Sequence, residues 1–207
     1  MKKIRLLCVT SPREDVTYQK QVEFACLGGA DMIQLRDKEM PKPALIKLAR
    51  ELQDICKSFE VPFTINDDPS IAKEAGCDGV HIGQKDMPYS QARKILPYGI
   101  IGVSALTLKN VEEINVSGAD YLGLTIFGTP SKKDAKPLGL DGLREAAKLT
   151  SIPIVAIGGI DLKSVKDVIK AGANGVAVIR AVCGAKDIKS AAKKMKDKIL
   201  EAEREMI

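Results

Sequence analysis

The chain has 207 residues, 45% of them hydrophobic and 29% charged, so it can form one sizeable core and is too apolar to be disordered. No apolar run approaches the ~20 residues of a membrane span. The N-terminus has the charge but not the apolar length or cleavage site of a signal peptide, so we expect a cytoplasmic protein without a membrane partner. The net charge of +5 is spread along the chain and aromatic residues make up only 4%, which disfavours nucleic acid and favours small anions such as phosphates.

Short apolar runs alternate with helical stretches along the whole chain. The runs are rich in Val, Ile and Leu, as buried parallel strands are, and cover residues 4–10, 32–36, 62–66, 79–83, 100–105, 121–127, 153–158 and 175–180. The alternation predicts an α/β fold, a single-domain (β/α)8 TIM barrel over residues 1–207. A doubly wound open sheet is the alternative, but no glycine-rich dinucleotide fingerprint follows the first run.

Helix signals stand between these runs. Pro43 marks the first turn of one amphipathic helix, and Asp187 is the expected N-cap of the last one. A phrase that begins with glycine and ends in Asp or Asn recurs before four of the runs. We interpret each copy as a helix C-terminal glycine that leads into the next strand. The copies are Gly28-Gly29-Ala30-Asp31, Gly76-Cys77-Asp78, Gly118-Ala119-Asp120 and Gly172-Ala173-Asn174.

Cysteine and histidine usage excludes several kinds of site. The five cysteines are odd in number and none stands at metal-ligand spacing, so we expect buried thiols in a reducing compartment. His81 is the single histidine, which excludes a zinc site that needs several histidines.

Polar residues follow the second run, at a strand end where barrels of this type place their chemistry. Strand alternation puts Gln34 and Arg36 on one side, with Lys38 just beyond. Two cations and an amide suit a polyphosphate. The alternative is a surface ion cluster that includes Asp37 and Glu39.

Carboxylates follow the third and fourth runs. Asp67 and Asp86 lie after adjacent strands, so they are candidates to converge on one Mg²⁺, which takes one or two carboxylates and phosphate oxygens. The alternative for Asp67 or Asp68 is N-capping of the next helix, and one of the two acids can cap while the other faces the barrel mouth.

Two further side chains occupy the fourth and fifth runs. His81 is expected on the inward face, where it would contact a ligand or orient a neighbour, although a purely structural histidine is the commoner case. Ser104 stands at the end of the fifth run.

The longest irregular stretch runs from Gly128 to Gly139 and is long for a connection in so small a barrel. It contains Thr129-Pro130-Ser131-Lys132-Lys133, whose hydroxyls and lysines suit an anion that needs covering, so we predict a functional loop that acts as a lid. The alternative is a mobile, solvated basic loop.

The last two strand ends predict a phosphate site. Gly158-Gly159 follows the seventh run and Ile179-Arg180 closes the eighth. Loops after strands seven and eight are the usual phosphate site of these barrels, because glycines let backbone N–H groups approach the phosphate.

Taken together, these residues resemble the thiamine phosphate synthase family over nearly the whole chain. The resemblance implies a (β/α)8 transferase that joins an aminopyrimidine methyl diphosphate to a thiazole phosphate, or its carboxylated form, and releases pyrophosphate. It is carried by Gln34 to Lys38, Ile65-Asn66-Asp67, Gly79-Val80-His81-Ile82-Gly83-Gln84, Asp86-Met87-Pro88, Ile101-Gly102-Val103-Ser104, Thr129 to Asp134, and Ala156 to Ile160.

The resemblance also assigns roles. The pyrimidine diphosphate would be bound by Gln34, Arg36, Lys38, Asn66, Ser104 and Lys132, and Mg²⁺ by Asp67 and Asp86. Thr129, Ser131 and Gly159, with the backbone at Ile179 and Arg180, would hold the thiazole phosphate, and Leu35, Asp37, His81 and Pro130 complete the substrate-binding set. Arg36, Lys38, Ser104 and Lys132 form the catalytic set, in a dissociative, carbocation-like reaction without a protein nucleophile.

The chain departs from the family pattern at two positions and in one short stretch. Family members usually carry serine where this chain has Arg180, and often histidine where it has Leu106. The stretch Gly123-Leu124-Thr125-Ile126-Phe127-Gly128 also replaces a common Gly-x-Gly-Pro-Ile-Phe-Pro phrase. A related thiazole tautomerase or regulatory barrel and a non-catalytic phosphate-binding barrel are the alternative functions, and a homo-oligomer stays open.

Overall fold

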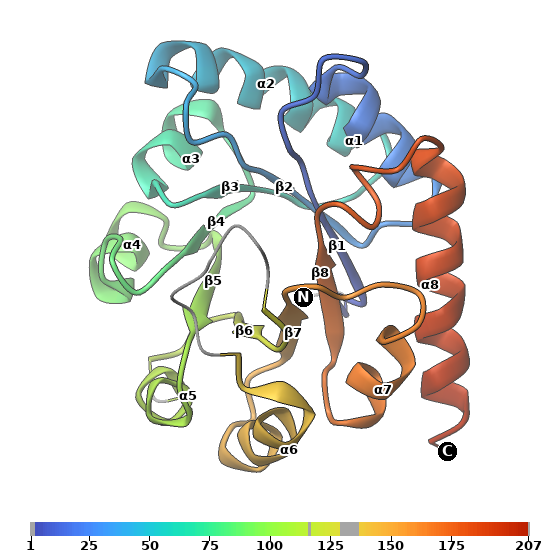
Figure 1. The fold of residues 1–207 in the computed structure, drawn as a ribbon. Coiled ribbons are helices and arrows are strands. Elements are labelled where there is room, and N and C mark those ends of the chain that lie inside the picture. Colours follow the sequence, from blue (N-terminus) through green and yellow to red (C-terminus); the bar gives the residue numbers. More distant parts are fainter. Residues whose placement is uncertain (1–2, 116, 129–136, 207) are drawn as a thin grey trace.

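The computed structural model describes residues 3–115, 117–128 and 137–206, in which strands and helices alternate regularly (Figure 1). The strands are β1 (Leu6–Val9), β2 (Met32–Leu35), β3 (Phe63–Asn66), β4 (Gly79–Ile82), β5 (Ile100–Ala105), β6 (Tyr121–Thr125), β7 (Ile154–Ile157) and β8 (Gly175–Val178). The helices are α1 (Tyr18–Leu27), α2 (Lys42–Ser58), α3 (Pro69–Ala75), α4 (Tyr89–Ile95), α5 (Leu108–Asn115), α6 (Gly139–Leu149), α7 (Val165–Lys170) and α8 (Ile188–Arg204).

The strands form one closed parallel barrel, with β8 paired to β1, and the helices surround it (Figure 1). The (β/α)8 prediction is therefore confirmed, and the open sheet is excluded. Several strands are shorter than predicted, although residues beside them still contribute to the barrel. At β1, for example, Ile4 still packs inside the barrel and the Thr10 N–H still donates to the Gln34 carbonyl at 2.9 Å.

Strand alternation divides the core into two layers. Along β1, Leu6 and Cys8 pack between the barrel and its helices, whereas Leu7 and Val9 pack inside the barrel. The predicted thiol burial is confirmed for Cys8, Cys26, Cys56 and Cys183, while Cys77 is half-buried. Burial raises the pKa of the Cys8 thiol, which keeps it protonated and unreactive.

The recurring glycine phrase has a second function at the opposite end of the barrel from the strand C-termini. Each phrase precedes an even-numbered strand, and its final Asp or Asn accepts a hydrogen bond from the first backbone N–H groups of the preceding odd-numbered strand. The contacts are Leu6 N–H to Asp31 Oδ2 (2.9 Å), Phe63 N–H to Asp78 Oδ2 (2.9 Å), Ile101 N–H to Asp120 Oδ2 (2.8 Å) and Ile154 N–H to Asn174 Oδ1 (2.8 Å). These contacts fix where neighbouring strands begin relative to one another.

The helix signals are also found in the structure. Asp187 caps α8 by accepting the Ser190 N–H at 2.9 Å, and Pro43 lies in the first turn of α2. Gly76 closes α3 with a φ of 71°, in the left-handed region that glycine adopts without strain. In the part of the chain that the structure describes, no helix is long and apolar enough to cross a membrane.

Replacing Asp31 tests the strand-start contacts. Asp31 accepts the N–H groups of Arg5 and Leu6 and pairs with Lys196, so Asp31→Ala leaves buried donors unsatisfied. We expect the free energy of unfolding to fall by about 1–3 kcal/mol in chemical denaturation. Asp54→Ala, whose side chain is 81% exposed on α2, should change it by less than about 0.5 kcal/mol. Equal effects of both substitutions would contradict this role for Asp31.

Candidate active site

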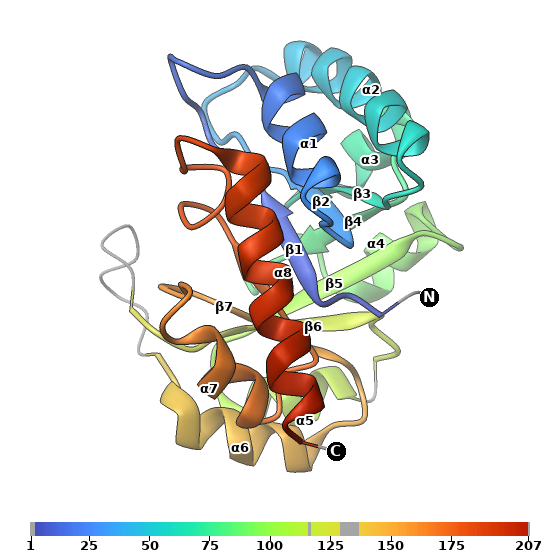
Figure 2. The ribbon, with the colours of Figure 1, turned by 90° about the vertical axis from the view of Figure 1, so that its right-hand side faces the viewer.

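The loops that follow the strands gather at one end of the barrel. In Figure 2 the loops after β1 and β8 lie at the end away from the chain's N-terminus. Because all strands are parallel and closed into one barrel, the polar residues predicted at their ends meet around this mouth.

An amide pair links the ends of β2 and β3. Gln34 Nε2 donates to Asn66 Oδ1 at 2.6 Å, and the Gln34 side chain is buried. Arg36 is the first residue after β2, and its N–H donates to Thr10 Oγ1 at 3.1 Å. Leu35 lies between them in the outer core, so its side chain points away from the mouth.

Asp37 organises the loop that carries Lys38. Its Oδ2 accepts the Tyr18 hydroxyl at 2.7 Å, and its Oδ1 accepts the N–H groups of Glu39 at 2.9 Å and Met40 at 3.1 Å. Burial raises the pKa of Asp37, but these hydrogen bonds outweigh it and lower the pKa overall. Both carboxylate oxygens are therefore engaged by the protein itself.

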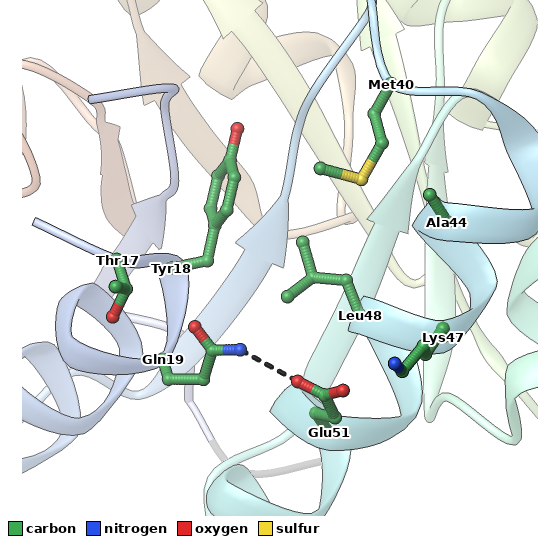
Figure 3. Close-up of a pocket in the computed structure, with 8 residues that line it drawn as sticks. All are labelled: Thr17, Tyr18, Gln19, Met40, Ala44, Lys47, Leu48 and Glu51. Carbon is green, nitrogen blue, oxygen red and sulfur yellow. Dashed lines mark hydrogen bonds between the residues drawn. The ribbon is translucent and has the colours of Figure 1, made fainter. Parts of the chain in front are cut away.

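A groove of about 400 Å³ lies between α1 and α2, outside the barrel (Figure 3). Its rim is bridged by a hydrogen bond from Gln19 Nε2 to Glu51 Oε2 at 2.8 Å. Tyr18 and Met40, which both contact Asp37, line this groove, so it adjoins the β2–α2 loop without opening onto the polar residues of the mouth.

A tight turn after β3 separates the roles of two neighbouring acids. Asp67 has a φ of 72°, its N–H donates to the His81 carbonyl at 2.8 Å, and the Asp68 N–H donates to the Asn66 carbonyl at 3.0 Å. A positive φ is uncommon for a residue other than glycine, although aspartate tolerates it better than most. Asp68 then caps α3 by accepting the Ser70 N–H at 2.7 Å, which leaves Asp67 to face the mouth.

Asp67 and Asp86 lie side by side beneath Lys38. Lys38 Nζ is 3.4 Å from Asp67 Oδ2, and Asp86 Oδ2 accepts the Gly83 N–H at 2.6 Å. Burial raises the pKa of Asp86; the Gly83 N–H opposes this, the Asp67 carboxylate raises the pKa further, and Lys38 lowers it. The net shift of the pKa is upward, as expected for a partly buried carboxyl that lies beside a second carboxylate whose charge Lys38 does not fully offset.

This pair fits a divalent cation of the magnesium type. Such an ion needs only one or two carboxylates, because water and substrate phosphate oxygens supply its other ligands. Among the described residues no group of three or more His, Cys, Asp or Glu surrounds a common point.

His81 projects into the barrel between two polar partners. Its ring stacks on Tyr121 with centroids 5.4 Å apart; Nδ1 lies 3.1 Å from the Tyr121 hydroxyl and Nε2 lies 2.9 Å from Ser104 Oγ. Two glycines make room for these rings. A Cβ at Gly123 would lie 2.6 Å from His81 Cε1, and a Cβ at Gly102 would lie 2.1 Å from Tyr121 Cζ.

Three contributors to the mouth were not predicted from the sequence. Tyr121 supports His81, Thr10 holds the Arg36 backbone, and Gln84 Nε2 donates to the Ser104 carbonyl at 2.5 Å. Strand alternation with Gly123 could have placed Tyr121 on the inward face. The contacts of Thr10 and Gln84 join different strands, so local sequence spacing carries no signal for them.

Glycines line the other side of the mouth, after β7. Gly158 and Gly159 have φ values of 100° and 61°, and a Cβ at Gly158 would lie 2.5 Å from the Phe127 carbonyl oxygen. Within the described residues, the backbone N–H groups of Gly159 and Arg180 have no hydrogen-bond acceptor. Both groups are thus able to donate to a ligand, and the Arg180 side chain is exposed.

Of the remaining residues singled out in the sequence, one is described by the structure and the others are not. Leu106 follows β5 and is 41% exposed. Thr129, Pro130, Ser131 and Lys132, with most of the predicted lid from Gly128 to Gly139, lie outside the described residues, and their roles stay predictions.

Comparison with known proteins identifies the relatives of this chain. The family model described as thiamine monophosphate synthase matches residues 6–182. A thiamine-phosphate synthase from Coprothermobacter proteolyticus is 46% identical over 186 residues, which cover 89% of this chain and 88% of that protein. One from Moorella thermoacetica is 46% identical over 184 residues, 87% of this chain and 88% of that protein. The solved structure of thiamine phosphate pyrophosphorylase from Pyrococcus furiosus matches with a TM-score of 0.90 at 35% identity and covers 97% of both chains.

The upward pKa shift of Asp86 predicts the pH dependence of stability without divalent cations. A carboxyl whose pKa is higher in the folded than in the unfolded protein makes folding less favourable once it ionises. Its contribution to the free energy of unfolding therefore falls as pH rises from the ordinary pKa of 3.8 through the raised pKa. Asp86→Asn removes this charge. We expect it to unfold at a higher temperature than wild type at pH 7 in EDTA, with a smaller difference near pH 3.5.

Asp141→Asn is the matched control, because the Asp141 side chain is 95% exposed and forms an ion pair with Arg144 on the same helix. It should give no gain at either pH. An Asp86→Asn protein that is less stable than wild type at pH 7 would show that the charge of Asp86 does not destabilise the folded protein.

Proposed function

The chain belongs to the thiamine monophosphate synthase family, a family of transferases, and from this premise we propose that it is a magnesium-dependent thiamine phosphate synthase. Its substrates would be 4-amino-2-methyl-5-hydroxymethylpyrimidine diphosphate and a thiazole phosphate, or its carboxylated form. The observation that carries the proposal is the division of one barrel mouth into a carboxylate–cation side around Asp67 and Lys38 and a glycine-lined side around Gly159.

The pyrimidine diphosphate would bind on the carboxylate–cation side. The amide pair of Gln34 and Asn66 offers a donor and an acceptor to the ring, and Arg36 and Lys38 offer positive charge to the diphosphate. The hydrogen bond from the Arg36 N–H to Thr10 and the Asp37 contacts fix both cationic residues on short, restrained backbone. We propose Lys132 as a further cation, supplied by the predicted lid.

Asp67 and Asp86 would hold Mg²⁺. When bound, the ion would neutralise charge on the diphosphate oxygens and make pyrophosphate a better leaving group. The structure supports this assignment through the proximity of the two carboxylates and the turn that directs Asp67 to the mouth while Asp68 caps α3.

The reaction would proceed by loss of pyrophosphate before attack. The bond between the pyrimidine methylene carbon and the diphosphate oxygen breaks, and its electron pair leaves with pyrophosphate while Arg36, Lys38 and Lys132 stabilise the growing negative charge. The amino group of the ring donates electrons to the resulting cation. The thiazole nitrogen then shares its lone pair with the methylene carbon, so no protein nucleophile takes part.

Ser104 and His81 would orient the pyrimidine. The His81 ring is fixed by Tyr121 on one side and Ser104 on the other, and Gln84 restrains the Ser104 backbone. These contacts hold the Ser104 hydroxyl at the mouth, where it can bind the ring. Positioning of this kind lowers the barrier by restricting the two reactants to a reactive geometry.

The thiazole phosphate would bind on the glycine-lined side. Gly159 and Arg180 offer backbone N–H groups, and the predicted Thr129 and Ser131 hydroxyls would complete the phosphate site. If backbone groups carry most of the binding, Arg180 replaces the usual serine without loss and adds a positive charge.

We also place the protein in the cytoplasm, which its five free cysteines support.

Incubation of the purified protein with both substrates tests this function. Wild type with Mg²⁺ should form thiamine phosphate and pyrophosphate in equal amounts, and EDTA should stop both. Asp67→Asn should lower turnover by more than about tenfold, a loss seen even for residues that only support a metal ligand. Asp54→Asn, on the exposed face of α2, should turn over like wild type.

Each failure points to a different alternative. Conversion of the thiazole phosphate alone, without the pyrimidine, would favour a tautomerase. Binding of both phosphates without any product would favour a non-catalytic barrel. Wild-type turnover by Asp67→Asn would remove Asp67 from the metal site.

A further inference from the structure

The loop between β1 and α1 also reaches the barrel mouth, although neither the sequence patterns nor the proposed mechanism gives a role to its residues after Thr10. It begins at Thr10 and ends at Thr17, the N-cap of α1. Its base is restrained by the fully buried Gln21, which accepts the Ser11 N–H at 3.2 Å and donates to the Ser11 carbonyl at 2.9 Å. The loop therefore has a fixed starting point from which a side chain can brace another element.

Arg13 reaches from this loop to the segment after β8. Its Nη1 donates to the carbonyls of Cys183 at 2.7 Å and Ala185 at 2.8 Å. The guanidinium edge formed by Nε and Nη2 contacts both carboxylate oxygens of Asp15, so the head group cannot rotate freely. The Arg13 side chain is only 16% exposed, which is low for an arginine on a surface loop.

The segment that Arg13 holds is a compact turn over residues 180–184. The N–H groups of Val182 and Gly184 donate to the Ile179 carbonyl, each at 3.3 Å, and the chain folds so closely that a Cβ at Gly184 would lie 2.8 Å from Arg180 Cα. The turn begins at the Arg180 N–H, on the thiazole-phosphate side, and Arg13 binds carbonyls at and just beyond its other end, those of Cys183 and Ala185. A shift at one end would move the other.

We propose that Arg13 is a positioning residue of the thiazole-phosphate site, acting through the turn at residues 180–184. This inference rests on the proposed function and deepens it. Arg13 contacts the far end of the turn rather than the substrate, and by fixing the Cys183 and Ala185 carbonyls it holds the Arg180 N–H in the direction that a phosphate needs.

A comparison of Michaelis constants tests the proposal. Arg13→Ala should raise KM for the thiazole phosphate about tenfold, as expected when a charge-assisted contact that fixes a binding group is lost. KM for the pyrimidine diphosphate should stay within about twofold of wild type. Arg13→Lys, which can reach a carbonyl but cannot form the forked contact with Asp15, should give an intermediate value.

Arg50→Ala is the matched control. Arg50 also donates to a backbone carbonyl, that of Glu74 at 3.1 Å, but it does so near the C-terminal end of α3, at the barrel end opposite the mouth. It should leave both KM values unchanged. Thermal unfolding of each variant shows whether any loss reflects unfolded protein.

The outcomes separate this inference from the proposed function. If wild type forms thiamine phosphate and Arg13→Ala raises only the thiazole-phosphate KM, the inference is supported. If wild type is active and Arg13→Ala leaves both constants unchanged, or raises both equally, the inference is wrong while the function stands. If wild type forms no product under any condition, the proposed function fails and this inference fails with it.

Discussion

Closure of eight parallel strands into one barrel is the constraint on which the rest of this molecule depends. It brings residues that are far apart in the chain, from Gln34 to Arg180, around a single mouth. At the other end, the contacts of Asp31, Asp78, Asp120 and Asn174 with neighbouring strands set the strand starts. The contacts that set the strand starts thus lie at one end of the barrel and the candidate chemistry lies at the other, which allows the mouth to accept unfavourable arrangements.

The carboxylate–cation side of the mouth is such an arrangement. Asp67 adopts a positive φ, and the pKa of Asp86 is raised by burial and by the Asp67 carboxylate. Strain and like charge of this kind persist only where the surrounding structure enforces them, and they are found most often at functional sites. Here the His81 carbonyl, the Gly83 N–H and Lys38 enforce the geometry.

Much of this structure could be predicted from the sequence, because the spacing of apolar residues marks the strands and helices and the position of polar residues marks the strand ends. The eight apolar runs, the glycine phrases and the acids after adjacent strands all follow from local spacing. Spacing also allows one of Asp67 and Asp68 to cap the next helix, but only the structure shows that Asp68 does so. Other features depend on contacts between distant segments. The bonds of Tyr18 to Asp37, Thr10 to Arg36 and Arg13 to Cys183 join residues whose proximity appears only when the barrel closes.

The central claim is that one half of the mouth binds a metal–diphosphate between Asp67, Asp86 and the cations of the β2–α2 loop. A crystal structure of the protein with Mn²⁺ and inorganic pyrophosphate, with anomalous diffraction measured at the manganese edge, tests it most directly. The account predicts an anomalous peak in contact with the Asp67 and Asp86 carboxylates, with pyrophosphate on its open side against Arg36 and Lys38. A peak elsewhere, or pyrophosphate bound only on the Gly159 side, would contradict it.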